Sequence, residues 1–229
     1  MPEVIQLHGL TNQQFFEEHA RPGRIGMVGG STLVDRVISR GQRHLIPDRK
    51  WSVWSHAFIF QGRRVDGHHW LIESDLAIQK RHIRLGVQEN RVAKYFDDEH
   101  FNAVAVLDLG LNPDQEQRLI SRALELVASA TRYSIRELFG TLWALHKPEL
   151  RPTENRMARE HAFYCSAFVR HLFSHAGVEL ARGIAVKNTT PEDIAQTTAA
   201  QKKWTMVRPA AAAPDDRSLR RARAKQGLS

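Results

Sequence analysis

Hydrophobic and polar residues alternate along two neighbouring stretches of the chain, "WSVWSHAFIF" (51–60) and "HHWLIES" (68–74). Both stretches are rich in β-branched and aromatic residues, and the polar segment between them, "QGRRVDG", contains two glycines. This combination predicts a β-hairpin. A third strand is expected at "FNAVAVLDLGL" (101–111), which is similarly apolar.

Apolar residues at intervals of three and four predict helices elsewhere in the chain. The clearest pattern places Leu119, Ala123, Leu126 and Val127 on one helical face after Asn112 and Pro113 have ended the third strand. Further helices are expected at "LTNQQFFEEHA" (10–20), capped by Thr11 or Asn12, in the second half of "RPGRIGMVGGSTLVDRVISRG" (21–41), and at "IRELFGTLWALH" (135–146). Helices before and after a short antiparallel sheet indicate an α+β fold.

The glycines of "GMVGGST" (26–32) resemble a phosphate-binding loop only superficially. Such a loop places a lysine before its Ser or Thr, and this segment has none. Close packing of the backbone explains the glycines more simply, and the segment is expected to be a turn that leads into a helix.

The chain has 229 residues, 42% of them hydrophobic, which is enough for one domain with a sizeable core. We expect this domain at residues 1–207 and a disordered basic tail, rich in Ala, Pro and Arg, at residues 208–229. The N-terminus lacks the pattern of a secretory signal peptide, and no apolar run is long enough to cross a membrane. The sequence therefore predicts a soluble protein, either cytoplasmic or exported by a signal-independent system, as bacterial effectors are.

Basic residues outnumber acidic ones by 33 to 25, for a net charge of +8 and a sequence pI near 10.0. This excess favours approach to anionic surfaces, including a peripheral membrane contact. The sequence contains no zinc-finger spacing and no aromatic-rich strand motif of single-strand binders, so nucleic acid is not an expected partner. The sequence does not indicate an oligomeric state.

The only cysteine, Cys165, lies in "EHAFYCSAFVRHLF" (160–173), where it shares a helical face with Phe168 and Leu172. A single cysteine cannot form an internal disulfide, so its thiol remains free. Most cysteines on a buried helical face are inert core residues. A nucleophilic role requires a histidine or a helix N-terminus to favour the thiolate.

Strand alternation selects His56 among the twelve histidines. It places His56 on one face with Trp54, Phe58 and Phe60, where an imidazole needs a polar partner. A hairpin centred between residues 64 and 65 would pair Phe60 with His69 and His56 with Glu73. Glu73 would then orient the His56 ring and support its cationic form. A core histidine and an ordinary ion pair remain the alternatives.

Zinc is a further alternative, because "DGHHW" places Asp66, His68 and His69 close together in the sequence. A zinc site needs three or four converging ligands, whereas His68 and His69 point to opposite faces of a strand. Solvated histidines in a turn are the simpler interpretation, and no metal or other cofactor is expected.

The order of "WSHAFIF", "WLIESD" and "FYCSAFV" resembles the circularly permuted branch of the NlpC-type, papain-like cysteine hydrolases, to which the lecithin:retinol acyltransferase-like enzymes are related. The segment at 21–41 is similar to the entry segment of this family, and "TRYSIRELFG" (131–140) resembles another of its segments. The similarity covers roughly residues 20 to 180. One departure is Arg24, which follows Gly23 where the family usually has Asp.

The resemblance implies a papain-like fold in which a small antiparallel sheet packs against helices, one of which carries the cysteine. It implies Cys165 as nucleophile, His56 as general base and acid, and Glu73 as the residue that orients His56. Tyr164 is a candidate contact for the oxyanion or the substrate. The backbone amide of Cys165 could stabilise the oxyanion if Cys165 begins its helix, whereas a longer helix capped by Thr153 would remove it from the N-terminus.

The implied reaction is attack on an amide bond through a thioester, with a cell-wall peptide of peptidoglycan as the expected substrate. Two alternatives remain open. The same residues could act as a phospholipase or an acyltransferase on lipid acyl esters, with Trp51, Trp54, Phe58, Phe60, Trp70 and Trp143 as candidates to line an acyl groove. The protein could also be a non-catalytic basic binding module with a structural cysteine.

The basic tail is expected to be dispensable for chemistry, because its Ala/Pro-rich start lacks apolar periodicity and cannot shape a pocket. Deletion of residues 209–229 should therefore preserve turnover of a small soluble substrate. It should weaken binding to anionic vesicles or wall fragments at low salt, where screening is weakest. A folded truncated protein that loses activity on the small substrate would place the tail in the site.

Overall fold

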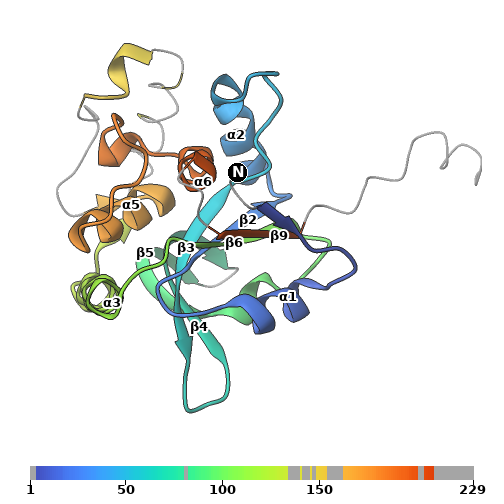
Figure 1. Ribbon diagram of the computed structural model, residues 1–229, viewed down its shortest axis with the longest axis vertical. Coiled ribbons are helices and arrows are strands. Elements are labelled where there is room, and N and C mark those ends of the chain that lie inside the picture. The colour runs from blue at the N-terminus through green and yellow to red at the C-terminus, as the bar shows by residue number, and fades with distance from the viewer. Residues whose placement is uncertain are drawn as a thin grey trace, which may run out of the picture.

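The computed structural model describes residues 4–79, 82–133, 140, 145, 148–153, 162–200 and 204–208. Over these residues the protein has an α+β fold, with a mixed sheet between helices on its two faces (Figure 1). The expected α+β class is therefore confirmed. No helix among the described residues is long and apolar enough to cross a membrane.

The described strands form a seven-stranded sheet in the order β1-β9-β6-β2-β3-β4-β5 and a separate pair, β7-β8. All neighbours in the large sheet are antiparallel except β1 and β9. The strands are β1 (Val4–Gln6), β2 (Ile25–Gly30), β3 (His56–Arg63), β4 (His69–Gln79), β5 (His82–Arg91), β6 (Phe101–Asp108), β7 (Arg132–Tyr133), β8 (Ala162–Phe163) and β9 (Trp204–Arg208).

Five α-helices lie within the described residues, and side chains cap the first three of them. Thr11, Thr32 and Asn112 each accept a hydrogen bond from the backbone of the first turn, in a capping box. The α-helices are α1 (Asn12–His19), α2 (Leu33–Gly41), α3 (Pro113–Ala128), α5 (Cys165–His175) and α6 (Pro191–Ala200). The 3-10 helices are η1 (Gln42–Leu45), η2 (Val92–Tyr95), η3 (Pro148–Leu150) and η4 (Val186–Asn188).

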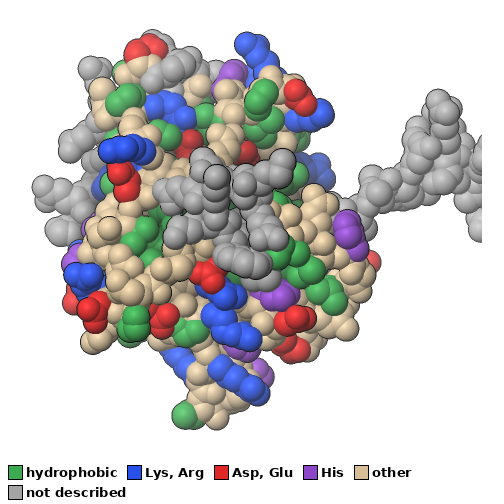
Figure 2. Space-filling view, in the orientation of Figure 1, with side chains coloured by type: hydrophobic (Ala, Val, Ile, Leu, Met, Phe, Trp, Pro, Cys, Tyr) green, Lys and Arg blue, Asp and Glu red, His purple; other side chains and the backbone are tan. Residues whose placement is uncertain are grey.

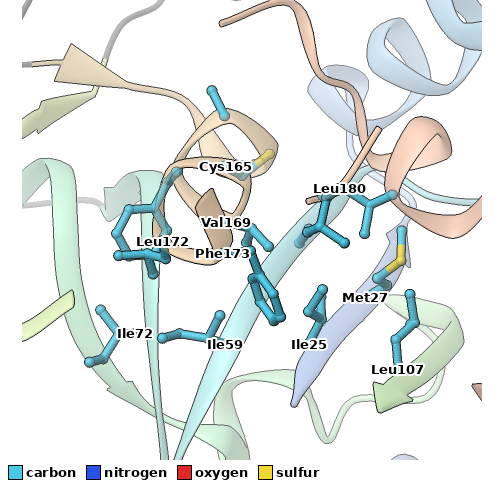
Figure 3. Close-up of a cluster of buried hydrophobic side chains, with 14 of the residues drawn as sticks. Ile25, Met27, Ile59, Ile72, Leu107, Cys165, Val169, Leu172, Phe173 and Leu180 are labelled. Atoms are coloured by element: carbon cyan, nitrogen blue, oxygen red, sulfur yellow. The ribbon is translucent and has the colours of Figure 1, made fainter. Parts of the chain in front are cut away.

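The large sheet has a hydrophobic cluster on each face. Ala57 and Ile59 of β3 contribute to the cluster covered by α3, α5 and α6. Figure 3 shows Val169 and Phe173 of α5 above this part of the sheet. Phe58 and Phe60 contribute to the opposite cluster, with Phe15 and Phe16 of α1 and Tyr95 of η2. The alternation predicted for β3 is therefore present, except that Trp54 precedes the strand and belongs to the cluster around α5.

The sheet is larger than the short antiparallel sheet expected from the sequence. The segment expected to be a glycine-rich turn is the central strand β2, and strands β1, β5 and β9 were not predicted. Gly26 and Gly29 of β2 lie where neighbouring elements approach the backbone too closely for a side chain. A Cβ atom at Gly26 would lie 2.1 Å from the Phe58 ring, and one at Gly29 would lie 2.0 Å from the Val53 carbonyl oxygen.

The hairpin formed by β3 and β4 has a different register from the one expected. Phe60 pairs with Leu71 rather than His69, and a β-bulge between Phe60 and Gly62 shifts the register further. The turn is also longer, because the Arg64 backbone N–H donates to the His68 carbonyl. The expected pairing of His56 directly opposite Glu73 is therefore wrong. The register differs by two residues, so both side chains remain on the same face.

Several expectations fall outside the described residues. They include most of the predicted helix at 135–146, the segment 154–161 and the tail beyond residue 208. Arg208, placed in the tail from the sequence, is the last residue of β9 and pairs with Val104 of β6. The sheet therefore extends one residue past the expected domain boundary.

The contact between Gly26 and Phe58 predicts the cost of a substitution in the central strand. Gly26→Ala should lower the free energy of unfolding by roughly 1–3 kcal/mol, because the new methyl group overlaps the buried ring. Chemical denaturation would measure this change. In a double-mutant cycle with Phe58→Leu, the two effects should be less than additive, because the smaller side chain relieves the overlap. Full additivity would contradict the proposed clash.

Candidate active site

His56 and Glu73 lie on adjacent strands and form the first contact of the site. His56 Nε2 lies 2.7 Å from Glu73 Oε2. His56 is the first residue of β3. Glu73 follows Ile72, which pairs with Ile59, so Glu73 lies diagonally across from His56 on the same face of the sheet. An ionised carboxylate only accepts hydrogen bonds, so Nε2 is the donor. This contact fixes both the position and the tautomer of the ring.

Glu73 is fully buried and is surrounded by hydrogen-bond donors. Its Oε1 atom accepts from Asn90 Nδ2 at 2.6 Å and from Lys94 Nζ at 2.6 Å, while its Oε2 atom also accepts from the Tyr95 hydroxyl. Burial alone would raise the pKa of Glu73. The charge of Lys94 and the hydrogen bonds from His56 and Lys94 outweigh burial and lower this pKa far below its ordinary value. The carboxylate is therefore ionised over the whole physiological range.

Lys94 and Tyr95 come from η2, which follows β5 directly. Lys94 Nζ also contacts Asp75 Oδ2 at 2.5 Å, so one ammonium group bridges two carboxylates of β4. The Tyr95 ring stacks on Phe58, with 4.8 Å between ring centroids and an interplanar angle of 3°. Burial and the charge of Glu73 raise the pKa of Tyr95, which keeps its hydroxyl protonated as a donor.

Cys165 is the first residue of α5, and its side chain is only 2% exposed. Figure 3 shows it at the end of the helix whose following turns carry Val169, Leu172 and Phe173 into the core. The helix does not begin at Thr153, because Tyr164 occupies the N-cap position in an extended conformation. The Tyr164 side chain makes no capping hydrogen bond to the first turn. Its N-cap position therefore leaves the backbone amides of that turn, beside the thiol, without the cap that Ser, Thr or Asp would supply.

The His56 ring lies beside the Cys165 thiol, and the two line the same cavity. Since Glu73 occupies Nε2, Nδ1 is the ring nitrogen left for the thiol. Burial lowers the pKa of His56, but the charge and hydrogen bond of Cys165, together with those of Glu73, outweigh it. The pKa of His56 is raised well above its ordinary value of 6.5. The structure thus brings Cys165, His56 and Glu73 together, in that order.

The hydroxyl groups beside the key residues have structural partners. Tyr164 and Ser166 both donate to the Thr189 carbonyl, at 2.5 and 2.8 Å. The Tyr164 donor is therefore engaged with the backbone and is not directed at an oxyanion. Ser55, next to His56, accepts from the Gly30 backbone at 3.0 Å. These contacts anchor the segments on which Cys165 and His56 lie.

A cavity of about 330 Å³ opens at His56 and Cys165. Its wall combines polar groups, including Asp75 and Lys94, with apolar side chains. The apolar part comes from Val28, Val34, Ile38 and Phe101, and so from β2, α2 and β6. The thiol and the imidazole therefore face a space that is lined by both charged and apolar side chains.

Five of the six aromatic residues expected to line an acyl groove are described, and none of these five lines the cavity. Trp54, Phe58 and Phe60 are in the core, and Trp51 is half exposed. Trp70 lies in the hairpin beneath the Arg64 guanidinium, and Trp143 is outside the described residues. The apolar lining comes instead from β2, α2 and β6. Val34 and Ile38 of α2 are four residues apart, a spacing from which the sequence predicted only a helix.

Sequence reasoning also missed the donors around Glu73. A buried carboxylate has more acceptor sites than one histidine can fill, which implies further donors. Asn90, Lys94 and Tyr95 could not be selected without β5, whose pairing with β4 places Asn90 opposite Leu71.

Asp66, one of the residues that suggested a zinc site in the sequence, has other partners. Asp66 accepts hydrogen bonds from the His68 backbone and the Trp70 indole, and it pairs with Arg91. Within the part of the chain that the structure describes, no three His, Cys, Asp or Glu side chains are grouped so that they could hold a metal ion.

The chain matches no protein-family model and no curated protein. Among solved structures, it is similar to the metalloprotein yiiX from Escherichia coli O157:H7, with 15% sequence identity and a TM-score of 0.47. The match covers 72% of this chain and 71% of that chain. This similarity is too low to assign a family or a function.

The contact with Glu73 predicts how the His56 imidazole titrates. Glu73→Gln should lower the pKa of His56, because it removes a charge and a strong acceptor that both favour the imidazolium. The ring resonances of His56, followed by NMR against pH, would report this change. Glu89→Gln, which removes a carboxylate on β5 that pairs with Arg64, should leave the titration of His56 unchanged. An unaltered His56 pKa in Glu73→Gln would contradict the described electrostatics.

Proposed function

We propose that the protein is a cysteine hydrolase of the permuted NlpC, papain-like type, with Cys165 as nucleophile, His56 as acid and base, and Glu73 as the residue that positions His56. The observation that carries this proposal is the His56 ring, which joins a buried, ionised carboxylate to a free thiol at the mouth of a cavity. A structural cysteine in the core would not need this partner.

The proposed reaction begins from a thiolate and an imidazolium. Cys165 Sγ attacks the substrate carbonyl carbon, and the carbonyl electron pair moves to oxygen. When the tetrahedral intermediate collapses, the amine or alcohol leaves with a proton from His56, and a thioester remains. The neutral His56 then takes a proton from water, the resulting hydroxide attacks the thioester, and the thiolate is released. The raised pKa of His56 supports its role as the initial proton donor.

The start of α5 supplies electrostatic stabilisation. The backbone N–H groups at a helix N-terminus carry partial positive charge, and Cys165 occupies the first helical position. A carbonyl oxygen that becomes negative beside Sγ would accept from the Cys165 backbone N–H. Because the core holds α5 rigidly, these donors are oriented before the substrate arrives.

The substrate of first choice is an amide bond in a cell-wall peptide, with an anionic cell-envelope component as partner. One observation favours a second candidate, a lipid acyl ester. Val28, Val34, Ile38 and Phe101 form an apolar wall beside Cys165, which would suit a hydrocarbon chain next to the scissile carbonyl. The protein should be incubated with peptidoglycan fragments and, separately, with phospholipids, and the products analysed by mass spectrometry. The products would distinguish hydrolysis of an amide, hydrolysis of a lipid ester, and acyl transfer.

Substitutions at the three residues test the covalent mechanism. Cys165→Ala and His56→Ala should each lower kcat/KM by roughly a thousandfold or more, because each removes a bond-making or proton-transfer step. Glu73→Gln should cause a smaller loss and move the alkaline limb of the pH profile to lower pH, since the imidazolium is lost sooner. His175→Ala, at the exposed end of α5, serves as a matched control. Undiminished turnover by Cys165→Ala would end the proposal.

A further inference from the structure

An exposed apolar surface lies on α2, beside the cavity of the candidate active site. Leu33 is 78% exposed and Val37 is 48% exposed, although the rest of the protein buries most of its large aliphatic side chains. Val34 is also exposed and at the same time lines the cavity. The surface and the cavity are therefore continuous, and they meet at Val34.

The arrangement around α2 follows from the helical period of about 100° per residue. Leu33 and Val37 lie next to Val34 on one side and next to the exposed Arg36 and Arg40 on the other. Moving around the helix, the surface thus passes from two guanidinium groups, across an apolar stripe, to the catalytic cavity. Figure 2 shows hydrophobic side chains beside Lys and Arg side chains over the region where Figure 1 places α2.

The charges near the surface are mainly basic. Asp35 of α2 is engaged in the capping box with Thr32. Asp48 pairs with Lys50 at 3.1 Å, so it is neutralised locally. Arg36 and Arg40 leave an excess of positive charge at the edge of the apolar stripe, which is complementary to an anionic layer above hydrocarbon.

We infer that the surface formed by Leu33, Val34 and Val37, with Arg36 and Arg40 at its edge, docks the protein on an anionic lipid membrane. Helix α2 would lie in the plane of the membrane, with its apolar stripe among the acyl chains and its arginines at the headgroup phosphates. The cavity then opens toward the headgroup region. The role of this orientation in catalysis rests on the proposed hydrolase function. The docking itself does not depend on catalysis.

Vesicle flotation with the full-length chain tests the docking surface. The protein should bind vesicles of phosphatidylcholine mixed with phosphatidylglycerol, and bind pure phosphatidylcholine vesicles more weakly. Leu33→Ser combined with Val37→Ser should lower the partition coefficient on anionic vesicles by about tenfold or more, because the inserted apolar area is lost. Arg36→Gln combined with Arg40→Gln should lower it by about tenfold on anionic vesicles only.

A matched control comes from α3, which carries an exposed apolar and an exposed basic residue away from the cavity. Leu124→Ser combined with Arg118→Gln should leave vesicle binding unchanged. The Leu33 and Val37 variant should retain wild-type turnover of a small soluble substrate, since neither residue lines the cavity. Circular dichroism would verify that each variant is folded.

Several outcomes would overturn the inference. They are an absence of vesicle binding by the full chain, wild-type binding by the Leu33 and Val37 variant, or binding that depends on residues 209–229 alone. A dimer that dissociates on the same substitutions, without any effect on vesicles, would assign the surface to a second copy of the chain. The Cys165→Ala protein should bind vesicles as the wild type does. Docking without hydrolysis would therefore refute the proposed function alone, and hydrolysis without docking would refute the surface alone.

Discussion

The candidate site depends on one constraint, the burial of the Glu73 carboxylate. A charged group without solvent is costly unless donors surround it, and four side chains serve this purpose here, namely His56, Asn90, Lys94 and Tyr95. Each of the four comes from β3, from β5 or from η2. The strands must therefore pair correctly before the charge is stable, and the correctly paired sheet in turn holds His56 at the thiol.

The central strand β2 contributes to this arrangement through a position that has no side chain. Phe58 must turn toward the cluster that contains Tyr95, and the absence of a side chain at Gly26 provides the space for its ring. Tyr95 then stacks on Phe58 and directs its hydroxyl at Glu73. Gly26 is therefore connected to the site through a series of contacts. Phe58 packs on Tyr95, and Tyr95 donates to Glu73, which contacts His56.

The contact between His56 and Glu73 could be predicted from alternation, although the register used to predict it was wrong. A shift of two residues preserves the face of a strand, so the two side chains still meet diagonally. The bulge between Phe60 and Gly62 could not be predicted, because a glycine permits the φ of 115° found at Gly62 but does not require it. Strands β1 and β9 were missed for a different reason. Each is short, and its identity as a strand depends on pairing between distant parts of the chain.

The reacting groups of the candidate site and the apolar lining of its cavity come from different parts of the fold. The reacting groups are positioned by β3, β4 and α5, which belong to the core and tolerate little change. The apolar lining comes from β2 and β6 and also from α2, whose outer face makes few demands on packing because Leu33 and Val37 are exposed. In the proposed reaction, the reacting groups therefore belong to the rigid part of the fold. The exposed face of α2, by contrast, can vary without disturbing the buried carboxylate.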